Sequence, residues 1–275
     1  MSSITCIPID FSTSAIAGPY DTFFALILED VFTASECVDL IALAESEEPW
    51  KPANAPREQP GKNRAPISGG EYAPVHAVSQ AFRNSERIMR DDPVTAAKIF
   101  ERIQPFLHEV AEIGPDNKFV DITGKAGQKW SAARGETGFW RLAKLNHRLR
   151  FLKYGPSQYF KPHCDGLQDV AGSDDGSEPT TKSFITIHLY LNDGNGLEGG
   201  ATRFYTPNKK RWLDVEPKLG RILIFQQRML VHSGEEVTGG TKYTLRTDIM
   251  FEKVVVTREQ RKAAEAAAAQ VETTE

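Results

Sequence analysis

The second half of the chain consists of short apolar segments separated by regular turn signals, and this pattern restricts the possible folds most strongly. The segment 183–191 is rich in β-branched and aromatic residues, and an Asn/Asp/Gly-rich turn follows at 192–196. Further short strands are expected over 198–205, 221–225, 230–236 and 242–253. Several short strands with regular turn signals predict a β-sandwich or barrel.

The first half of the chain contains helix signals instead. An apolar strand is expected over 23–28, and Thr33 three residues before Glu36 forms a capping box that predicts a helix over about 34–47. Asp92 followed by Pro93 resembles an N-cap with proline at the first helical position. We therefore expect one mainly β (α+β) domain.

The domain boundaries follow from these patterns. The expected domain covers 1–257, with helical support over about 24–115, a β core over about 145–253, and an Ala-rich tail at 258–275 that frays.

Composition excludes several classes of protein. The formal net charge is −4, which gives no support to nucleic-acid binding. The three cysteines are widely spaced and suit neither a disulfide framework nor a zinc knuckle. The start of the chain shows no secretory signal, and no apolar run approaches the ~20 residues of a membrane span. We expect a cytoplasmic or nuclear protein that is not secreted and has no membrane or nucleic-acid partner.

One candidate metal site stands out. His163 and Asp165 are two residues apart, so a strand would direct both side chains to the same side, and His232 lies far downstream. Two histidines and one carboxylate can form the facial triad of non-haem Fe(II) oxygenases. Alternatively, Pro162 to Gly166 is a surface turn without a metal.

The segment 242–251 supports the metal hypothesis. Its alternation places Lys242, Thr244, Arg246 and Asp248 on one face of a strand and apolar residues on the other. Two cations inside a barrel require a nearby anion, although the same polar face could instead meet solvent.

Several ordered motifs carry a family resemblance. The matching segments are 149–156 (LRFLKYGP), 160–166 (FKPHCDG), 189–192 (LYLN), 199–204 (GGATRF), 217–225 (PKLGRILIF) and His232 through Lys242-Tyr243. Together they resemble the prolyl 4-hydroxylase-like branch of the Fe(II)/2-oxoglutarate-dependent dioxygenases, over about residues 145–252. The element Arg83-Asn84-Ser85 also resembles that branch.

This resemblance implies a double-stranded β-helix (a jelly roll) with N-terminal supporting helices. It implies iron ligation by His163, Asp165 and His232, with 2-oxoglutarate and O2 as co-substrates and ascorbate as a further candidate cofactor. Lys242 occupies the position that binds the far carboxylate of 2-oxoglutarate, and Arg246 is the second choice.

Other candidate residues leave alternatives open. Tyr154 and Tyr190 match pocket-lining positions for 2-oxoglutarate, or are ordinary core aromatics. Arg83 and His188 are candidate substrate contacts, or a support for the helices and a core histidine, respectively.

The resemblance also implies an activity. We expect a prolyl 4-hydroxylase-like enzyme that acts on a peptidyl proline or another protein side chain. The same chemistry on a small molecule is the first alternative, and a non-catalytic jelly-roll binding protein is the second. The oligomeric state remains undetermined from the sequence.

Overall fold

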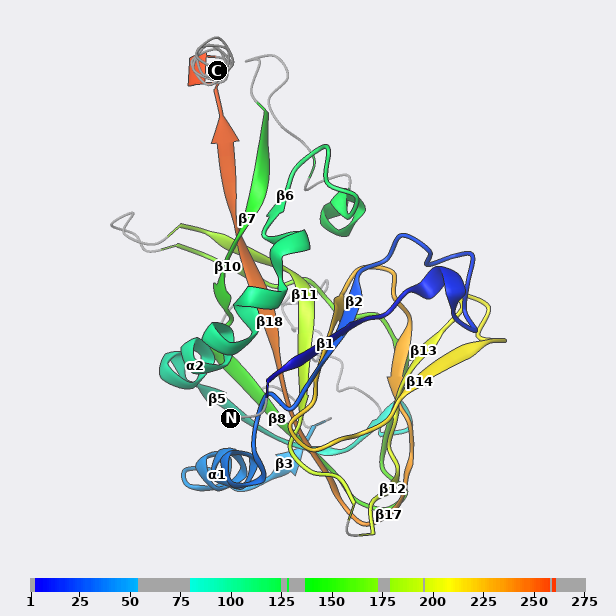
Figure 1. The fold of residues 1–275 in the computed structure, drawn as a ribbon. Coiled ribbons are helices and arrows are strands. Elements are labelled where there is room, and N and C mark those ends of the chain that lie inside the picture. Colours follow the sequence, from blue (N-terminus) through cyan, green and yellow to red (C-terminus); the bar gives the residue numbers. More distant parts are fainter. Residues whose placement is uncertain are drawn as a thin grey trace, which may run out of the picture.

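The computed structural model of this protein describes residues 3–53, 80–124, 128, 137–172, 179–194, 196–257 and 259–260. Nearly all of the tail that was expected to fray lies outside these residues. Figure 1 shows a mainly β molecule with its helices on one side of the larger sheet.

The larger sheet is the central element of the fold, and its neighbouring strands pair antiparallel. Its main path runs in the order β1 (Thr5–Pro8), β2 (Ala25–Glu29), β15 (Ile222–Gln226), β11 (Thr181–Tyr190), β18 (Lys242–Val256), β8 (Arg148–Tyr154), β5 (Glu86–Asp91) and β3 (Lys51–Pro52). Three strands join from the side: β10 (Asp169–Val170), β6 (Glu112–Ile113) and β7 (Thr137–Leu145).

A smaller antiparallel sheet faces it, in the order β14 (Trp212–Val215), β13 (Thr202–Tyr205), β16 (His232–Gly234), β9 (Tyr159–His163) and β4 (Arg83–Asn84). A separate hairpin-like pair consists of β12 (Glu198–Gly199) and β17 (Val237–Gly239). The chain passes repeatedly between the two sheets, which is the arrangement of a double-stranded β-helix. The expected fold class is therefore confirmed.

The helices begin where the capping signals predict. In α1 (Ala34–Glu45), the Thr33 hydroxyl accepts from the Glu36 backbone N–H, and the Glu36 carboxylate accepts from the Thr33 N–H. In α2 (Pro93–Ile103), the Asp92 side chain accepts from the N–H of Thr95. Short 3₁₀ turns complete the helical structure, at Phe11–Thr13, Gln104–Phe106, His108–Val110 and Val120–Thr123.

Alternation along the strands divides the larger sheet into two different faces. One cross-strand row joins Ile222, Leu189, Leu245, Phe151 and Ile88, all of which belong to the apolar core beneath the helices. Because side chains alternate between faces, the neighbouring row points to the interior between the two sheets. That row joins Leu223, His188, Arg246, Arg150 and Met89, and it is largely polar.

The region 24–115 contains more strand than the sequence indicates. Besides the two helices it contributes β2 to β6 to the sheets, and β7 begins before the expected start of the β core. The segment 86–91 is strongly charged and lacks a strand-like apolar alternation. It becomes a strand because its backbone pairs with β8, which is a tertiary interaction that local sequence does not report.

Candidate metal centre and its cationic cavity

The three predicted metal ligands come together between the two sheets. β9 and β16 are neighbours, and their register places His163 opposite His232. Asp165 lies two residues beyond the end of β9, and the exposed Cys164 between them takes no part. One ligand atom from each of the three residues lies within 4.8 Å of the others.

Hydrogen bonds orient both imidazole rings toward the carboxylate. Nδ1 of His163 lies 2.8 Å from the carbonyl of Lys161, and Nδ1 of His232 lies 3.1 Å from the carbonyl of Leu230. A carbonyl only accepts, so each Nδ1 carries a proton, and in the neutral form of each ring Nε2 has the lone pair that a metal would bind. These Nε2 atoms lie 3.7 and 3.6 Å from the Asp165 oxygens. This tautomer and orientation suit a shared metal ion.

The carboxylate of Asp165 is held in its charged form. Its Oδ2 accepts from the Thr186 hydroxyl at 2.7 Å, and its Oδ1 lies 2.9 Å from Nη2 of Arg246. Burial raises the pKa of Asp165, but Arg246 and the two histidines outweigh burial, and the pKa lies well below its usual value. Burial lowers the pKa of His232 to about 4, so this ring is neutral and able to bind a metal.

A second buried carboxylate, that of Asp248, stands behind Arg246. It accepts from Nη1 of Arg150 at 2.9 Å and from the Gln227 amide at 2.9 Å, and Nη2 of Arg246 lies 3.4 Å away. Arg150, Thr186 and Gln227 were not among the residues predicted from the sequence. Thr186 shares the strand face of His188, so alternation along 183–191 was the available signal.

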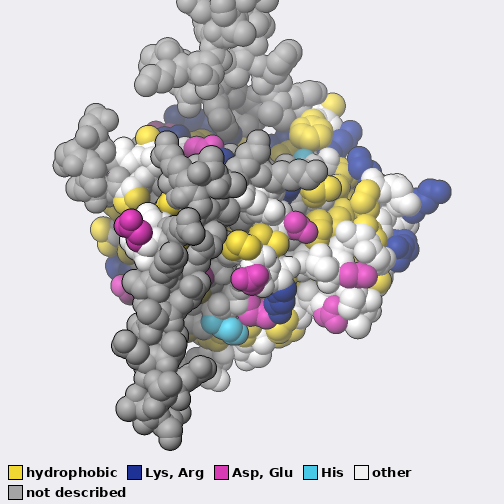
Figure 2. Space-filling model, turned by 90° about the horizontal axis from the view of Figure 1, so that it is seen from above, with side chains coloured by type: hydrophobic (Ala, Val, Ile, Leu, Met, Phe, Trp, Pro, Cys, Tyr) yellow, Lys and Arg dark blue, Asp and Glu magenta, His cyan; other side chains and the backbone are white. Residues whose placement is uncertain are grey.

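The cavity beside these ligands is strongly cationic. Its lining includes Arg83, Arg87, Arg150, Lys242 and Arg246, whereas Asp165 is its only acidic lining residue among those that the structure describes. Acidic and basic side chains are interspersed on the outer face in Figure 2. The described lining of this cavity is thus mainly cationic, in a protein whose net charge is negative.

Lys242 is buried in this cavity without a carboxylate partner among the described residues. It is 1% exposed, Nζ donates to the Gly200 carbonyl at 2.6 Å, and Nζ lies 4.7 Å from the centroid of the Tyr154 ring. Burial lowers the pKa of Lys242 to about 8. A buried ammonium needs an anion for compensation, which fits the far carboxylate of a keto acid.

Three buried polar atoms near Lys242 also lack hydrogen-bond partners within the described part of the chain. They are Nε2 of His188, Oγ1 of Thr244 and Nε of Arg246. Unpaired buried polar atoms are uncommon in folded proteins and need an explanation. His188 and Arg246 line the cavity and lie opposite each other in the β11–β18 register, so a polar ligand of the size of 2-oxoglutarate accounts for their two unpaired atoms together.

The remaining predicted residues are placed as follows. Tyr154, Arg83 and His188 line the cavity. Tyr190 does not line it: its hydroxyl donates to Thr202 at 2.6 Å, and its ring packs in an apolar cluster between the sheets. Arg246 lines the cavity but its guanidinium engages Asp165, which leaves Lys242 as the better partner for a far carboxylate.

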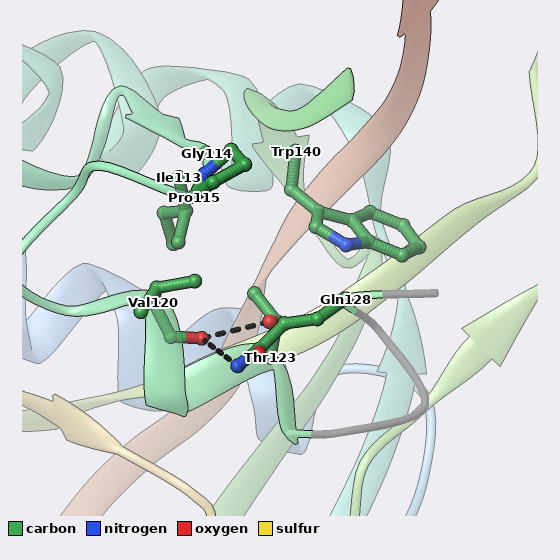
Figure 3. A pocket seen from close by; sticks show the side chains of 7 residues that line it. All are labelled: Ile113, Gly114, Pro115, Val120, Thr123, Gln128 and Trp140. Atoms are coloured by element: carbon green, nitrogen blue, oxygen red, sulfur yellow. Dashed lines mark hydrogen bonds between the residues drawn. The ribbon is translucent and has the colours of Figure 1, made fainter. Parts of the chain in front are cut away.

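A second cavity offers no comparable chemistry. It lies near β6 and β7, and Figure 3 shows the seven residues that line it, none of them charged. The Val120 carbonyl in its wall accepts from the Thr123 hydroxyl at 2.8 Å and from the Gln128 amide at 3.1 Å. The cationic cavity contains the metal-ligand cluster and is therefore the candidate functional site.

Comparison with known families identifies the domain that carries this site. Residues 149–247 match the family model of the 2OG-Fe(II) oxygenase superfamily, and this range includes all three candidate ligands and Lys242. This part of the chain is a 2OG-Fe(II) oxygenase domain. Fe(II) and 2-oxoglutarate are the cofactors that this family implies, and the His163, Asp165 and His232 cluster supplies the ligand set for the iron.

Several solved structures resemble the oxygenase at low identity. A viral collagen prolyl hydroxylase from Paramecium bursaria Chlorella virus-1 is 19% identical, with 85% of this chain and 99% of that chain covered and a TM-score of 0.43. A Pseudomonas putida prolyl-4-hydroxylase is 17% identical, with 84% and 94% covered and a TM-score of 0.45. A Trichoplax adhaerens prolyl hydroxylase is 12% identical, with 82% of each chain covered and a TM-score of 0.45.

These similarities are too weak to transfer a substrate to the oxygenase. No curated protein sequence matches the chain.

Within the described residues, no helix has both the length and the apolar character needed to cross a membrane.

Proposed function

We propose that the oxygenase hydroxylates a C–H bond of its substrate, most directly on a peptidyl proline or another protein side chain. In the balanced reaction, substrate, 2-oxoglutarate and O2 give hydroxylated substrate, succinate and CO2. The observation that carries the proposal is that one cavity holds both the ligand cluster and the buried Lys242, which has no carboxylate partner among the described residues. The motifs of the prolyl 4-hydroxylase-like branch support the choice of substrate.

Different residues of the cavity have different roles in the proposed reaction. His163, Asp165 and His232 would hold Fe(II), which supplies the redox chemistry that couples O2 reduction to oxidation of the keto acid and the substrate. Lys242 would bind the far carboxylate of 2-oxoglutarate, and the Tyr154 ring, 4.7 Å from Nζ, would shield that ion pair from water. Arg246 and Thr186 keep the Asp165 carboxylate charged and fixed in orientation.

The test is Fe(II)-dependent release of succinate from 2-oxoglutarate, with proline-containing peptides as first substrates and mass spectrometry to detect one added oxygen. We expect wild-type protein to release succinate and the His232→Ala variant to release none. Tight binding of Fe(II) and 2-oxoglutarate without any succinate would favour a non-catalytic jelly roll. Failure to bind either one would contradict the proposal. Turnover with small molecules but no peptide would move the substrate to that class.

A further inference from the structure

The charge of the cavity exceeds what iron and 2-oxoglutarate require. Among its described lining residues and the groups directly behind them, the positive groups are Arg83, Arg150, Arg246 and Lys242, and the negative groups are Asp165 and Asp248. Arg87 also lines the cavity and is engaged in interactions of its own. Four positive and two negative groups leave an excess of two positive charges. This argument rests on the proposed function.

Loading the site does not remove this excess. Fe(II) adds two positive charges and 2-oxoglutarate adds two negative charges, so the pair contributes no net charge. Lys242 is then matched by the far carboxylate, while Arg150 and Arg246 share Asp248 and Arg246 also contacts Asp165. Arg150 and Arg246 are only 15% and 20% exposed, and Arg83 is half-buried. Because charges held largely away from water are normally paired, an excess of this size next to a reaction centre calls for another anion.

Arg83 is the cation with the least internal compensation. Its Nε donates to the Ser85 hydroxyl at 3.1 Å, and its guanidinium lies 4.5 Å from the centroid of the Phe160 ring. No carboxylate among the described residues forms an ion pair with it. The Phe160 ring stacks on the ring of His163 with centroids 3.7 Å apart. Arg83 is therefore one aromatic ring away from a candidate metal ligand.

Arg150 approaches the same cavity from the larger sheet. It lies opposite Arg246 in the β8–β18 register, and its side chain keeps 15% exposure while Nη1 pairs with the fully buried Asp248. Burial and the neighbouring Arg246 lower the pKa of Arg150, although Asp248 opposes them. The single carboxylate of Asp248 thus compensates two guanidinium groups only in part.

We infer that the primary substrate carries an oxyanion, either a carboxylate or a phosphate, that Arg83 and Arg150 bind close to the carbon that is hydroxylated. Guanidinium groups suit this task because their planar N–H donors match oxyanions in two-point hydrogen bonds. A peptide substrate would accordingly present an acidic or phosphorylated residue beside its reacting side chain, and a small substrate would be an acid.

The experiment uses protein loaded with Co(II) and N-oxalylglycine, which fill the iron and keto-acid sites without turnover. Inorganic phosphate and acetate are titrated by calorimetry at constant ionic strength, and acetamide serves as the neutral match of acetate. We expect at least one anion to bind, and acetamide not to bind. Arg83→Gln should weaken anion binding about tenfold, the effect of losing one charge-assisted hydrogen bond, and Arg83→Lys should restore part of it.

The matched control is Arg148→Gln. Arg148 lies two residues from Arg150 on β8 but is 44% exposed and pairs with Asp91 outside the cavity, so its loss should leave anion binding unchanged. Anion binding that is absent in loaded wild-type protein, or equal in Arg83→Gln and wild type, would overturn the inference. If Arg83→Gln fails to bind N-oxalylglycine, the wild-type protein provides the test. Binding of acetate but not of acetamide supports the inference, and equal binding of the two overturns it. Wild-type protein that does not bind Co(II) and N-oxalylglycine contradicts the proposed function instead.

Discussion

Replacing Lys242 by methionine separates its charge from its volume and tests the keto-acid site most directly. Lowering the pKa from 10.5 to about 8 corresponds to roughly 3 kcal/mol of destabilisation for carrying this charge in the ligand-free protein. Methionine removes that cost but also removes the hydrogen bond to the Gly200 carbonyl and the contact with the Tyr154 ring. These contacts contribute about 1–3 kcal/mol together. We therefore expect the free energy of unfolding to change by less than about 2 kcal/mol.

Binding of 2-oxoglutarate should respond far more strongly than stability. Removing one partner of a buried, hydrogen-bonded charge pair costs about 2–5 kcal/mol, which corresponds to an affinity loss of roughly 30-fold to several thousand-fold. The assay is a calorimetric titration of 2-oxoglutarate in the presence of Co(II), together with urea unfolding of the ligand-free protein. Affinity within fivefold of wild type would refute the assignment of Lys242. A loss of more than about 3 kcal/mol of stability would instead indicate a structural role.

The pH dependence of the wild-type protein gives an independent check. The unfolded lysine keeps a pKa of 10.5, so between about pH 8 and 10.5 the unfolded chain binds more protons than the folded chain. The contribution of Lys242 therefore makes the ligand-free protein more stable as the pH rises through this window. Affinity for 2-oxoglutarate should fall over the same window, because the lysine must regain its proton to pair with the carboxylate. Lys242→Met should abolish that fall.

Three further predictions concern other parts of the structure. Arg246→Met should weaken Co(II) binding about tenfold, because Asp165 loses the guanidinium that orients it; unchanged affinity in an absorbance titration would exclude this role. His232→Ala should remove measurable Co(II) binding while the circular dichroism spectrum stays native, and retained binding would show that another group is the ligand. Thr33→Ala should lower the free energy of unfolding by about 1 kcal/mol through loss of the α1 capping box; urea titration measures this, and Co(II) affinity serves as its control.

The capping signals and the alternation of 242–251 were sufficient to predict local structure. A capping box depends on residues three apart, and strand alternation depends on residues two apart, so both signals are contained in a short window. For the same reason Lys242 and Arg246 could be placed on one strand face in advance, and the structure shows both side chains lining one cavity. The β4 and β5 strands could not be predicted in this way, because pairing with distant strands creates them.

The sequence by itself determined that His163, Asp165 and His232 were available as ligands, together with a downstream cation. Tertiary structure alone decided which groups surround them. The antiparallel register across β11, β18 and β8 places His188, Arg246 and Arg150 in one row, and a shift by one residue would replace them with Leu189, Leu245 and Phe151 or their neighbours. In that register Arg246 pairs with Asp165, and the buried Lys242 has no carboxylate partner within the part of the chain that the structure describes. Pairing between strands far apart in the sequence thus brings several cations together in one cavity, although the net charge of the chain is negative.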